Sequence, residues 1–283
     1  MDTEAQVNQG LSKISNLVVQ FFSLLSVHIK NSRRRNINMN RANKLKCSLL
    51  GLAITPFMVV ADEQYYDYGF IGLSGSYGES VFSDEDEASI SPEPNLFYNG
   101  KYGFVDGSLV NVSVLPYVGI SGQWRFAEVS DDFEDIPTGI QDRDGSGELG
   151  FTVGTVGARV TFLHDVSSVH DGYEVQAHLG RSFDTPIQNL TLTPYIEVDY
   201  RDKKLSQHLY NISAAESAAS GLSAYNSGSS WVYQGGLIGI YTFAPKWLAL
   251  AKFELESHDS DSPLVQRDLG WAMSLGVAYK FTD

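Results

Sequence analysis

Residues 268–281 alternate strictly between two kinds of side chain. One set is apolar with aromatic rings near both ends: Leu269, Trp271, Met273, Leu275, Val277, Tyr279 and Phe281. The other set is small or polar: Asp268, Gly270, Ala272, Ser274, Gly276, Ala278 and Lys280. A period of two predicts a β-strand, and this one is longer than the roughly 5–6 residues usual in soluble sheets. An apolar face opposite a small, polar face favours a transmembrane β-barrel; an edge strand of a large soluble sandwich is the alternative.

Similar period-two runs, separated by turn signals, continue from Tyr68 to the end of the chain. They predict an all-β fold, a transmembrane antiparallel up-and-down barrel of ten strands, with twelve as the alternative count. The expected strands are 67–78, 94–104, 109–127, 147–154, 157–165, 171–183, 189–200, 230–243, 246–257 and 268–281. The alternation slips by one residue between Val153 and Val156. A slip would turn later side chains to the wrong face, so we expect a tight turn at 154–157.

The lengths of the connections alternate as a membrane barrel requires. If both termini lie in the periplasm, odd-numbered connections are extracellular and long, and even-numbered connections are short. The odd connections are 79–93, 128–146, 166–170, 201–229 and 258–267, and the even ones are 105–108, 155–156, 184–188 and 244–245. Four of the five odd connections exceed every even one, and the fifth equals the longest. A soluble sandwich has no reason to alternate in this way.

Aromatic residues near strand ends predict two interfacial girdles. In 230–243, Trp231 and Tyr233 share a face with Tyr241 and Phe243. Ten residues at about 3.3 Å each, tilted by about 40°, separate the pairs by roughly 25 Å, the height of a barrel's apolar band. We expect Tyr279 and Phe281 to belong to the periplasmic girdle.

Charge and cysteine content exclude several kinds of protein. Residues 1–61 hold eight of the 20 Lys and Arg residues but only two of the 34 Asp and Glu residues. The remainder carries 12 basic and 32 acidic residues, a net charge of −20, which disfavours nucleic-acid binding. The single cysteine, Cys47, lies outside that remainder, so no intrachain disulfide or thiolate metal site is expected there. No stretch approaches the roughly 20 apolar residues of a membrane-spanning helix.

The N-terminal region has the pattern of a targeting segment. Residues 39–61 combine a short basic stretch, an apolar run and the small residues Val59-Val60-Ala61, which is the pattern of a cleaved secretory signal peptide. We interpret residues 1–38 as a non-native extension with translation starting at Met39; the alternative is an unusually long basic region of the signal. The barrel domain is expected to span 62–283.

Two motifs in the last third resemble those of the MipA/OmpV family of outer-membrane proteins. The first is the long-loop segment 210–225, with Tyr210, Glu216, Ser217, Ser220, Gly221 and Tyr225. The second is Asp261-Ser-Pro-Leu-Val265, with Ser262 and Pro263. Asp142-Arg-Asp144, His170-Asp-Gly172 and Ala278-Tyr-Lys-Phe281 also fit the family pattern. Two departures are Asn211, where the family usually has Gly, and Thr282-Asp283, which follow the Phe at which family chains commonly end.

The resemblance implies an outer-membrane barrel in a Gram-negative cell. Its expected partners are outer-membrane lipids, lipopolysaccharide and the barrel-assembly machinery. The family includes a protein that resembles a scaffold, binding a lytic transglycosylase and a murein synthase beneath the outer membrane. A scaffold linking murein synthesis and hydrolysis is therefore the first hypothesis. A cation-preferring, porin-like channel for small solutes and a surface adhesin are the alternatives.

Two loop segments imitate catalytic or metal sites. Asp142-Arg-Asp-Gly-Ser-Gly-Glu148 resembles the start of an EF-hand, but position 12 is Val153 instead of the required Glu. We interpret it as a solvated acidic loop; looser cation binding with the acidic runs 84–87 and 131–135 is the alternative. His258-Asp-Ser-Asp-Ser262 contains hydrolase residue types, but adjacent loop residues cannot form a triad. We therefore expect no enzyme activity, no cofactor and no metal.

The long loop and the lumen hold the remaining candidate residues. Ser213 followed by Glu216 is a capping-box pattern and Gly221 a stop signal, so we expect a short helix in 201–229 that folds over the barrel mouth. That loop serves packing alone or contacts a ligand or partner. The expected lumen charges are Arg159, Glu174, His178, Glu197, Asp199, Lys252 and Glu254. Because small barrels are filled by their own side chains, these charges should block the interior or leave a narrow cation path.

Overall fold

The computed structural model describes residues 67–83, 88–130 and 136–283. The expected signal peptide (39–61), the N-terminal extension (1–38) and the acidic runs 84–87 and 131–135 lie outside these residues and stay predictions.

The described chain forms one antiparallel sheet that closes on itself, because β10 pairs with β11. The strands are β1 (Tyr68–Glu79), β2 (Ser89–Gly100), β3 (Gly103–Asp106), β4 (Leu109–Leu115), β5 (Val118–Arg125), β6 (Ser146–Thr155), β7 (Ala158–Asp165), β8 (Tyr173–Gly180), β9 (Phe183–Asp184), β10 (Leu190–Arg201), β11 (Ser230–Ala244), β12 (Trp247–Asp259) and β13 (Gly270–Lys280). The two-residue β9 pairs only with β10, beside β8, so twelve strands surround the lumen. The predicted class, a closed up-and-down barrel, is confirmed.

The strand count is the alternative one, twelve instead of ten, because two expected strands are hairpins. The chain turns at Lys101-Tyr102 between β2 and β3, and at Pro116-Tyr117 between β4 and β5. Tyr117 adopts a φ of 62°, a left-handed conformation that no Gly or Asn signals here. The turn expected at 154–157 is present, with Gly154 at a φ of 123° and its N–H donating to the Tyr117 carbonyl at 2.8 Å.

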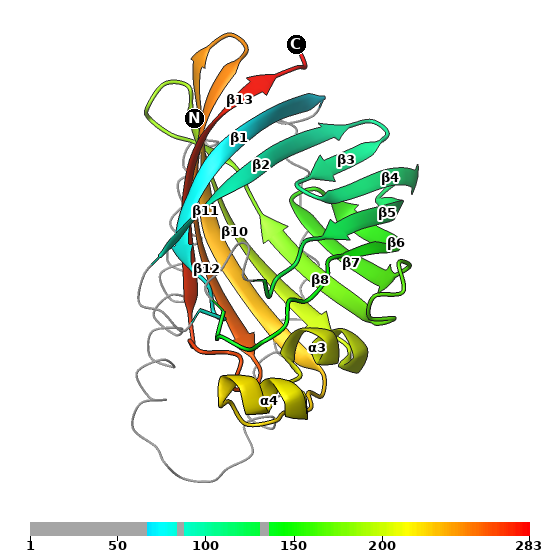
Figure 1. The fold of residues 1–283 in the computed structure, drawn as a ribbon. Helices are drawn as coiled ribbons and strands as arrows, with labels where there is room; N and C mark the ends of the chain where they lie inside the picture. The colour runs from blue at the N-terminus through cyan, green and yellow to red at the C-terminus, as the bar shows by residue number, and fades with distance from the viewer. Residues whose placement is uncertain (1–66, 84–87, 131–135) are drawn as a thin grey trace, which may run out of the picture. The chain divides into compact units, whose positions relative to one another are not determined.

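Long and short connections lie at opposite ends of the barrel. Figure 1 shows α3 and α4, from the connection after β10, at one end, while the β11–β12 turn and the C-terminus lie at the other. Apart from the short β3–β4 turn at 107–108, the connections on the side of α3 and α4 are longer than those at the opposite end. We call the end with α3 and α4 the loop end and the opposite end the turn end. Rings also gather at the two ends: Tyr200 and Trp231 at the loop end (centroids 5.1 Å apart), Trp247 and Tyr279 at the turn end (5.5 Å).

The outer wall is apolar and the inner wall largely polar. Along β13, Met273, Leu275 and Val277 are 53%, 73% and 48% exposed, while Ser274 between them is buried. Such large apolar exposure on every second residue is unfavourable in water but suits a lipid-facing wall. β13 pairs with β1 from Phe70↔Lys280 to Glu79↔Trp271, as expected for the closing strand.

The loops at the loop end form a separate small core above the lumen. α3 (Lys203–Tyr210) and α4 (Ala214–Ser220) belong to it; α4 is the expected helix, with the Ser213–Glu216 capping box and Gly221 at a φ of 77°. Its buried residues come from four connections: Val81, Phe82, Val129, Leu205, Leu209, Tyr210, Ile212 and Leu264. We call these packed loops the lid. Neither described helix is long and apolar enough to cross a membrane.

The turn end of the lumen holds a second apolar cluster. Phe70, Leu248, Leu250 and Ala278 are buried there, and Phe97 packs on Phe70 with ring centroids 5.6 Å apart. Hydrocarbon from the neighbouring strands β11, β12, β13, β1 and β2 therefore lines one side of the lumen at the turn end, whereas polar contacts, described below, lie beneath the lid.

Candidate functional site

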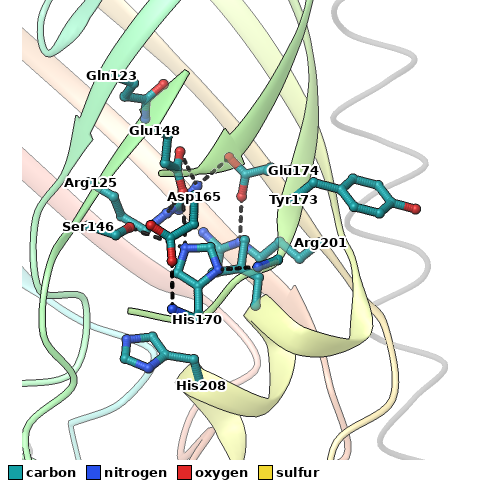
Figure 2. Close-up of polar contacts among 12 residues, drawn as sticks. Gln123, Arg125, Ser146, Glu148, Asp165, His170, Tyr173, Glu174, Arg201 and His208 are labelled. Atoms are coloured by element: carbon teal, nitrogen blue, oxygen red, sulfur yellow. Dashed lines mark hydrogen bonds and ion pairs between the residues drawn. The ribbon is translucent and has the colours of Figure 1, made fainter. Parts of the chain in front are cut away.

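Two arginines of the inner wall share Glu128 and Glu174 just beneath the lid, and Arg125 also binds Glu148. Figure 2 shows both arginines with Glu148 and Glu174. Arg125 of β5 donates to Glu148 (2.9 Å), Glu174 (2.8 Å) and Glu128 (2.7 Å). Arg201 of β10 donates to Glu174 from Nε (2.8 Å) and to Glu128 from Nη2 (2.9 Å). Both arginines, Glu148 and Glu174 are at most 6% exposed. This set of five residues is called the charge network below.

A histidine extends the charge network toward the β7–β8 connection. His170 Nδ1 accepts the Gly172 N–H at 3.0 Å, so the proton of the neutral ring lies on Nε2. Nε2 lies 3.2 Å from Ser146 Oγ and 3.4 Å from Glu148 Oε1. Asp165 fixes this connection, accepting the backbone N–H of His170 at 2.7 Å. The imidazole thus acts as a donor toward the network.

Tyr210 ties the lid to the barrel wall. Its hydroxyl accepts from Arg201 at 2.9 Å and lies 2.9 Å from His258 Nδ1, and its carbonyl accepts from Ser262 Oγ at 2.7 Å. Burial raises the pKa of Tyr210 to about 12, against the opposing effect of Arg201, so the hydroxyl stays protonated. The two recognised motifs, 210–225 and 261–265, therefore meet in one structural unit.

The other expected lumen residues form pairs farther down the barrel. Arg159 lies 2.8 Å from Asp106 and 3.8 Å from Glu197, which also bonds His178 Nδ1 at 2.7 Å. A second set joins Lys252 to Glu93 (3.5 Å) and Glu254 (3.2 Å), and Glu254 bonds the hydroxyl of Tyr195. Asp199 is 3% exposed, and its Oδ1 has no hydrogen-bond partner among the described residues.

An open pocket of about 490 Å³ lies on the lid. Its walls come from the β5–β6 connection, the end of α3 and the start of α4. They are mostly polar: Asp142, Arg143, Asp144, Gln207, His208, Asn211, Ile212, Ser213, Glu216, Tyr225 and Asn226. Such a volume lies within the roughly 300–1,000 Å³ usual for small-molecule sites.

Glu216 organises the pocket wall. It accepts from Arg143 at 2.8 Å, from the Gln141 N–H at 3.2 Å and from the Ser213 N–H at 2.8 Å. Burial alone would raise the pKa of Glu216, but hydrogen bonds, the strongest of them from Ser213, lower this pKa to about 2. On the same wall, burial lowers the pKa of His208, whose Nε2 lies 3.0 Å from the Asp144 carbonyl oxygen.

The remaining motif residues support the lid from within. Ser217 and Gly221 close the last turn of α4, the Gly221 N–H donating to the Ser217 carbonyl at 3.0 Å. Ser220 Oγ donates to the Glu216 carbonyl at 2.7 Å, and Tyr225 pairs with Ile212. The Pro263 carbonyl accepts from Gln266 at 2.6 Å. Of the predicted loop residues, Glu216 and Tyr225 line the pocket.

The structure places the two imitation motifs in ordinary roles. In the EF-hand-like stretch, Ser146 already begins β6 and Glu148 is bound to Arg125. In the hydrolase-like stretch, His258 and Ser262 contact opposite ends of Tyr210, and no hydrogen bond joins them in the described structure. Among residues 67–83, 88–130 and 136–283, no group of three or more His, Cys, Asp or Glu side chains is placed to hold a metal ion.

Sequence reasoning missed most of the charge network. Arg201 falls in the expected connection 201–229, and Arg125, although it lies within the expected strand 109–127, is not among the predicted lumen charges. Arg125 keeps the inward parity of Ser121 and Gln123, and Arg201 that of Glu197 and Asp199. Inward parity was the signal that could have identified both arginines.

The closed twelve-strand wall, the outward apolar belt and the ring-lined strand ends define an outer-membrane β-barrel. A family model described as "MltA-interacting protein MipA" matches residues 71–281. The chain therefore belongs to the MipA family.

Two proteins of Escherichia coli (strain K12) are similar to this chain. One, named "Putative outer membrane protein YiaT", is 25% identical over 249 residues, covering 83% of this chain and 98% of the relative. The other, named "MltA-interacting protein", is 35% identical over 95 residues, covering 32% of this chain and 38% of the relative. A solved structure, neisserial surface protein A, matches 76% of this chain and 96% of its own at 9% identity and a TM-score of 0.27.

Proposed function

We propose that this protein is a non-conducting, non-catalytic scaffold of the outer membrane that binds enzymes of murein hydrolysis and synthesis. The observation that carries the proposal is a lumen that is covered at the loop end and lined on one side by packed hydrocarbon at the turn end. The charge network and lid close the loop end, and Phe70, Leu248 and Leu250 pack at the turn end. A lumen covered by a packed lid favours a role on the barrel's surface over transport. The name of the 35% identical relative, MltA-interacting protein, supports a murein hydrolase as partner.

The partner surface would be the turn end, which faces the periplasm in barrels of this kind. Its short turns expose large side chains, with Tyr102 74%, Tyr117 67% and Ile187 61% exposed. Exposed aromatic residues are typical anchors of protein interfaces, so short turns can still present a binding surface.

Binding of the purified, lipid-embedded protein to a lytic transglycosylase tests the proposal. Tyr102→Ala with Tyr117→Ala should weaken binding by at least about tenfold, as loss of interface anchors does. The matched control is His208→Ala at the loop end, which should bind as the wild type. Equal binding by both variants would place the partner elsewhere.

Planar-bilayer recording separates this proposal from the cation-preferring channel. We expect no unitary conductance from the wild type. Tyr210→Ala, which removes the hydroxyl contact with Arg201, should also stay silent, because the charge network and the rest of the lid core remain. Stable steps from the wild type would overturn the non-conducting assignment.

A second candidate function, recognition of a small polar solute at the cell surface, is favoured by the 490 Å³ pocket. The extracellular end of the barrel presents it, and its carboxylates and amides suit a ligand rich in hydrogen-bond donors. A solute that binds the wild type but not Asn226→Ala would support this function independently of the scaffold.

A further inference from the structure

β2 is paired along its whole length on one edge but only partly on the other. Toward β1 its partners run from Tyr68↔Asn99 to Gly78↔Ser89. Toward β3 they run only from Phe97↔Asp106 to Gly100↔Gly103. The β3–β4 hairpin then turns back, and Figure 1 shows it ending partway along β2. Within the described residues, no backbone segment pairs with the second edge of 89–95.

The register identifies the backbone groups on this open edge. The Gly107 N–H donates to the Leu96 carbonyl at 2.9 Å, so the peptide groups of Leu96 point toward β3. Because peptide groups alternate between edges in an antiparallel sheet, those of Ile90, Pro92 and Pro94 point the same way. The two prolines have no N–H. The open edge of 89–95 thus offers three carbonyl oxygens and a single donor, the Ile90 N–H.

The open edge reaches from the interface into the apolar belt. Ile90 lies opposite Tyr77, whose ring contacts Trp271 (centroids 5.7 Å apart), and Leu96 lies opposite Ile71. Unsatisfied backbone groups are strongly unfavourable against hydrocarbon and are tolerated at membrane depth only beside protein or a wet cavity. Because the Ile90 N–H is its only donor, this edge also pairs poorly with an added strand. Neither bulk lipid nor a partner strand therefore satisfies the free carbonyl groups of this edge.

The two faces beside this edge differ in chemistry. Outside, Ile90 is 81% and Leu96 39% exposed, continuous with the apolar belt. Inside, Glu93 lies 3.5 Å from Lys252, which lies 3.2 Å from Glu254, so two carboxylates share one cation. The side chains of Glu93 and Lys252 are each 31% exposed, so a molecule in the lumen can reach them.

We propose that the wall beside 89–95 is a lateral port that binds a single-chain amphiphile with a primary ammonium head. The chain lies along Ile90, Pro92, Pro94 and Leu96 on the outer face. The head enters the wall, donates to the free carbonyls, and places its charge at Glu93. This inference stands apart from the scaffold, since it uses neither the turns nor the lid.

Electron paramagnetic resonance on the full-length protein in lipid nanodiscs tests the port. The probe is a spin-labelled dodecylammonium, with dodecyltrimethylammonium, dodecyl sulfate and methylammonium as competitors. We expect a motionally restricted fraction that unlabelled dodecylammonium displaces. Dodecyltrimethylammonium, which lacks N–H donors, should compete less well, and dodecyl sulfate and methylammonium should not compete. Equal competition by dodecyl sulfate would overturn the proposed head group.

Paired variants locate the binding. Ser91→Trp fills the inner side of the edge and should abolish binding, whereas Val160→Trp, on the outer face of β7 and five strands from β2, should retain it. Glu93→Gln should lower affinity by about tenfold through loss of one neighbouring charge. Unboiled gel migration checks that each variant is folded. If Ser91→Trp does not assemble, Ser91→Cys blocked with a benzyl reagent after assembly replaces it. Equal affinities for the Ser91 and Val160 variants would overturn the port.

Discussion

The two ends of the lumen are packed with opposite kinds of side chain. At the loop end, Arg125 and Arg201 hold Glu128 and Glu174 between them, and each buried charge depends on its neighbours. At the turn end, Leu248 and Leu250 pack on Phe70 without any polar requirement. Hydrocarbon packing is non-directional, whereas a buried ionic network fails when one member is missing. A single substitution in the charge network should therefore destabilise the loop end more than a single substitution destabilises the turn end.

Removing one arginine should have the largest effect. Arg201→Met leaves Glu174 and Glu128 short of a buried cation, so we expect about 4 kcal/mol loss in the free energy of unfolding. Urea unfolding in lipid vesicles measures it. The control is Arg181→Met, which removes an exposed guanidinium outside the network and should change stability little. A loss below about 1 kcal/mol for Arg201→Met would break the comparison, since surface ion pairs lie in that range.

A cavity at the turn end should have a smaller effect. Leu248→Ala removes a fully buried side chain, and we expect a loss of about 3 kcal/mol in the same urea experiment. Leu275→Ala is the matched control, because Leu275 is 73% exposed on the lipid-facing wall. Similar losses for the two leucines would show that the turn end is not a packed core.

Loss of a helix cap should affect the lid alone. Ser213 Oγ accepts the Glu216 N–H at 3.2 Å, and Ser213→Ala should destabilise α4 by about 1 kcal/mol. Hydrogen exchange of the α4 amides should quicken while that of the β11 and β12 amides is unchanged. Ser223→Ala, an exposed serine after α4, should leave exchange as it is. Faster exchange in the strands would mean that the lid and wall unfold together.

Acid should loosen the lid through Glu216. Its folded pKa of about 2 lies below the usual carboxyl value, so its contribution is present above about pH 4.5 and is lost as pH falls toward 2. α4 exchange, measured against a global unfolding reference, should therefore quicken over this window. Glu216→Gln should lack this component, and an identical pH response in both proteins would exclude Glu216 as its source.

Much of the fold could be predicted from side-chain periodicity, because a membrane wall imposes it on every strand. Leu275 and Ser274 show the rule, facing lipid and lumen respectively. The turns at Lys101-Tyr102 and Pro116-Tyr117 were not predicted because neither two-residue turn is itself an Asn-Gly or Gly-Gly pair. Asn99-Gly100, just before the first turn, lies within β2. The beginning of β2 was missed for another reason: Pro92 and Pro94 normally end a strand, and here they lie where its edge is open.

The site was less predictable, because it depends on which loops meet. The family motifs pointed to 210–225 and 261–265, and Glu216 and Tyr225 do line the pocket. Nothing in the sequence brings Arg143 to Glu216 across 73 positions. The Tyr210 hydroxyl likewise meets Arg201 and His258 only once the barrel has formed. Long-range contacts of this kind are set by topology and not by local pattern.

The pairing of β1 with β13 has a consequence for biogenesis. The Gly69 N–H donates to Thr282 Oγ1 at 3.1 Å across a sequence separation of 213 positions. One edge of β1 stays unpaired until β13 has been synthesised. Pairing of these two strands therefore has a large entropic cost of loop closure. A waiting edge invites pairing with other chains. Accurate assembly therefore requires that the free edge of β1 is shielded during synthesis and released for pairing with β13 at the end.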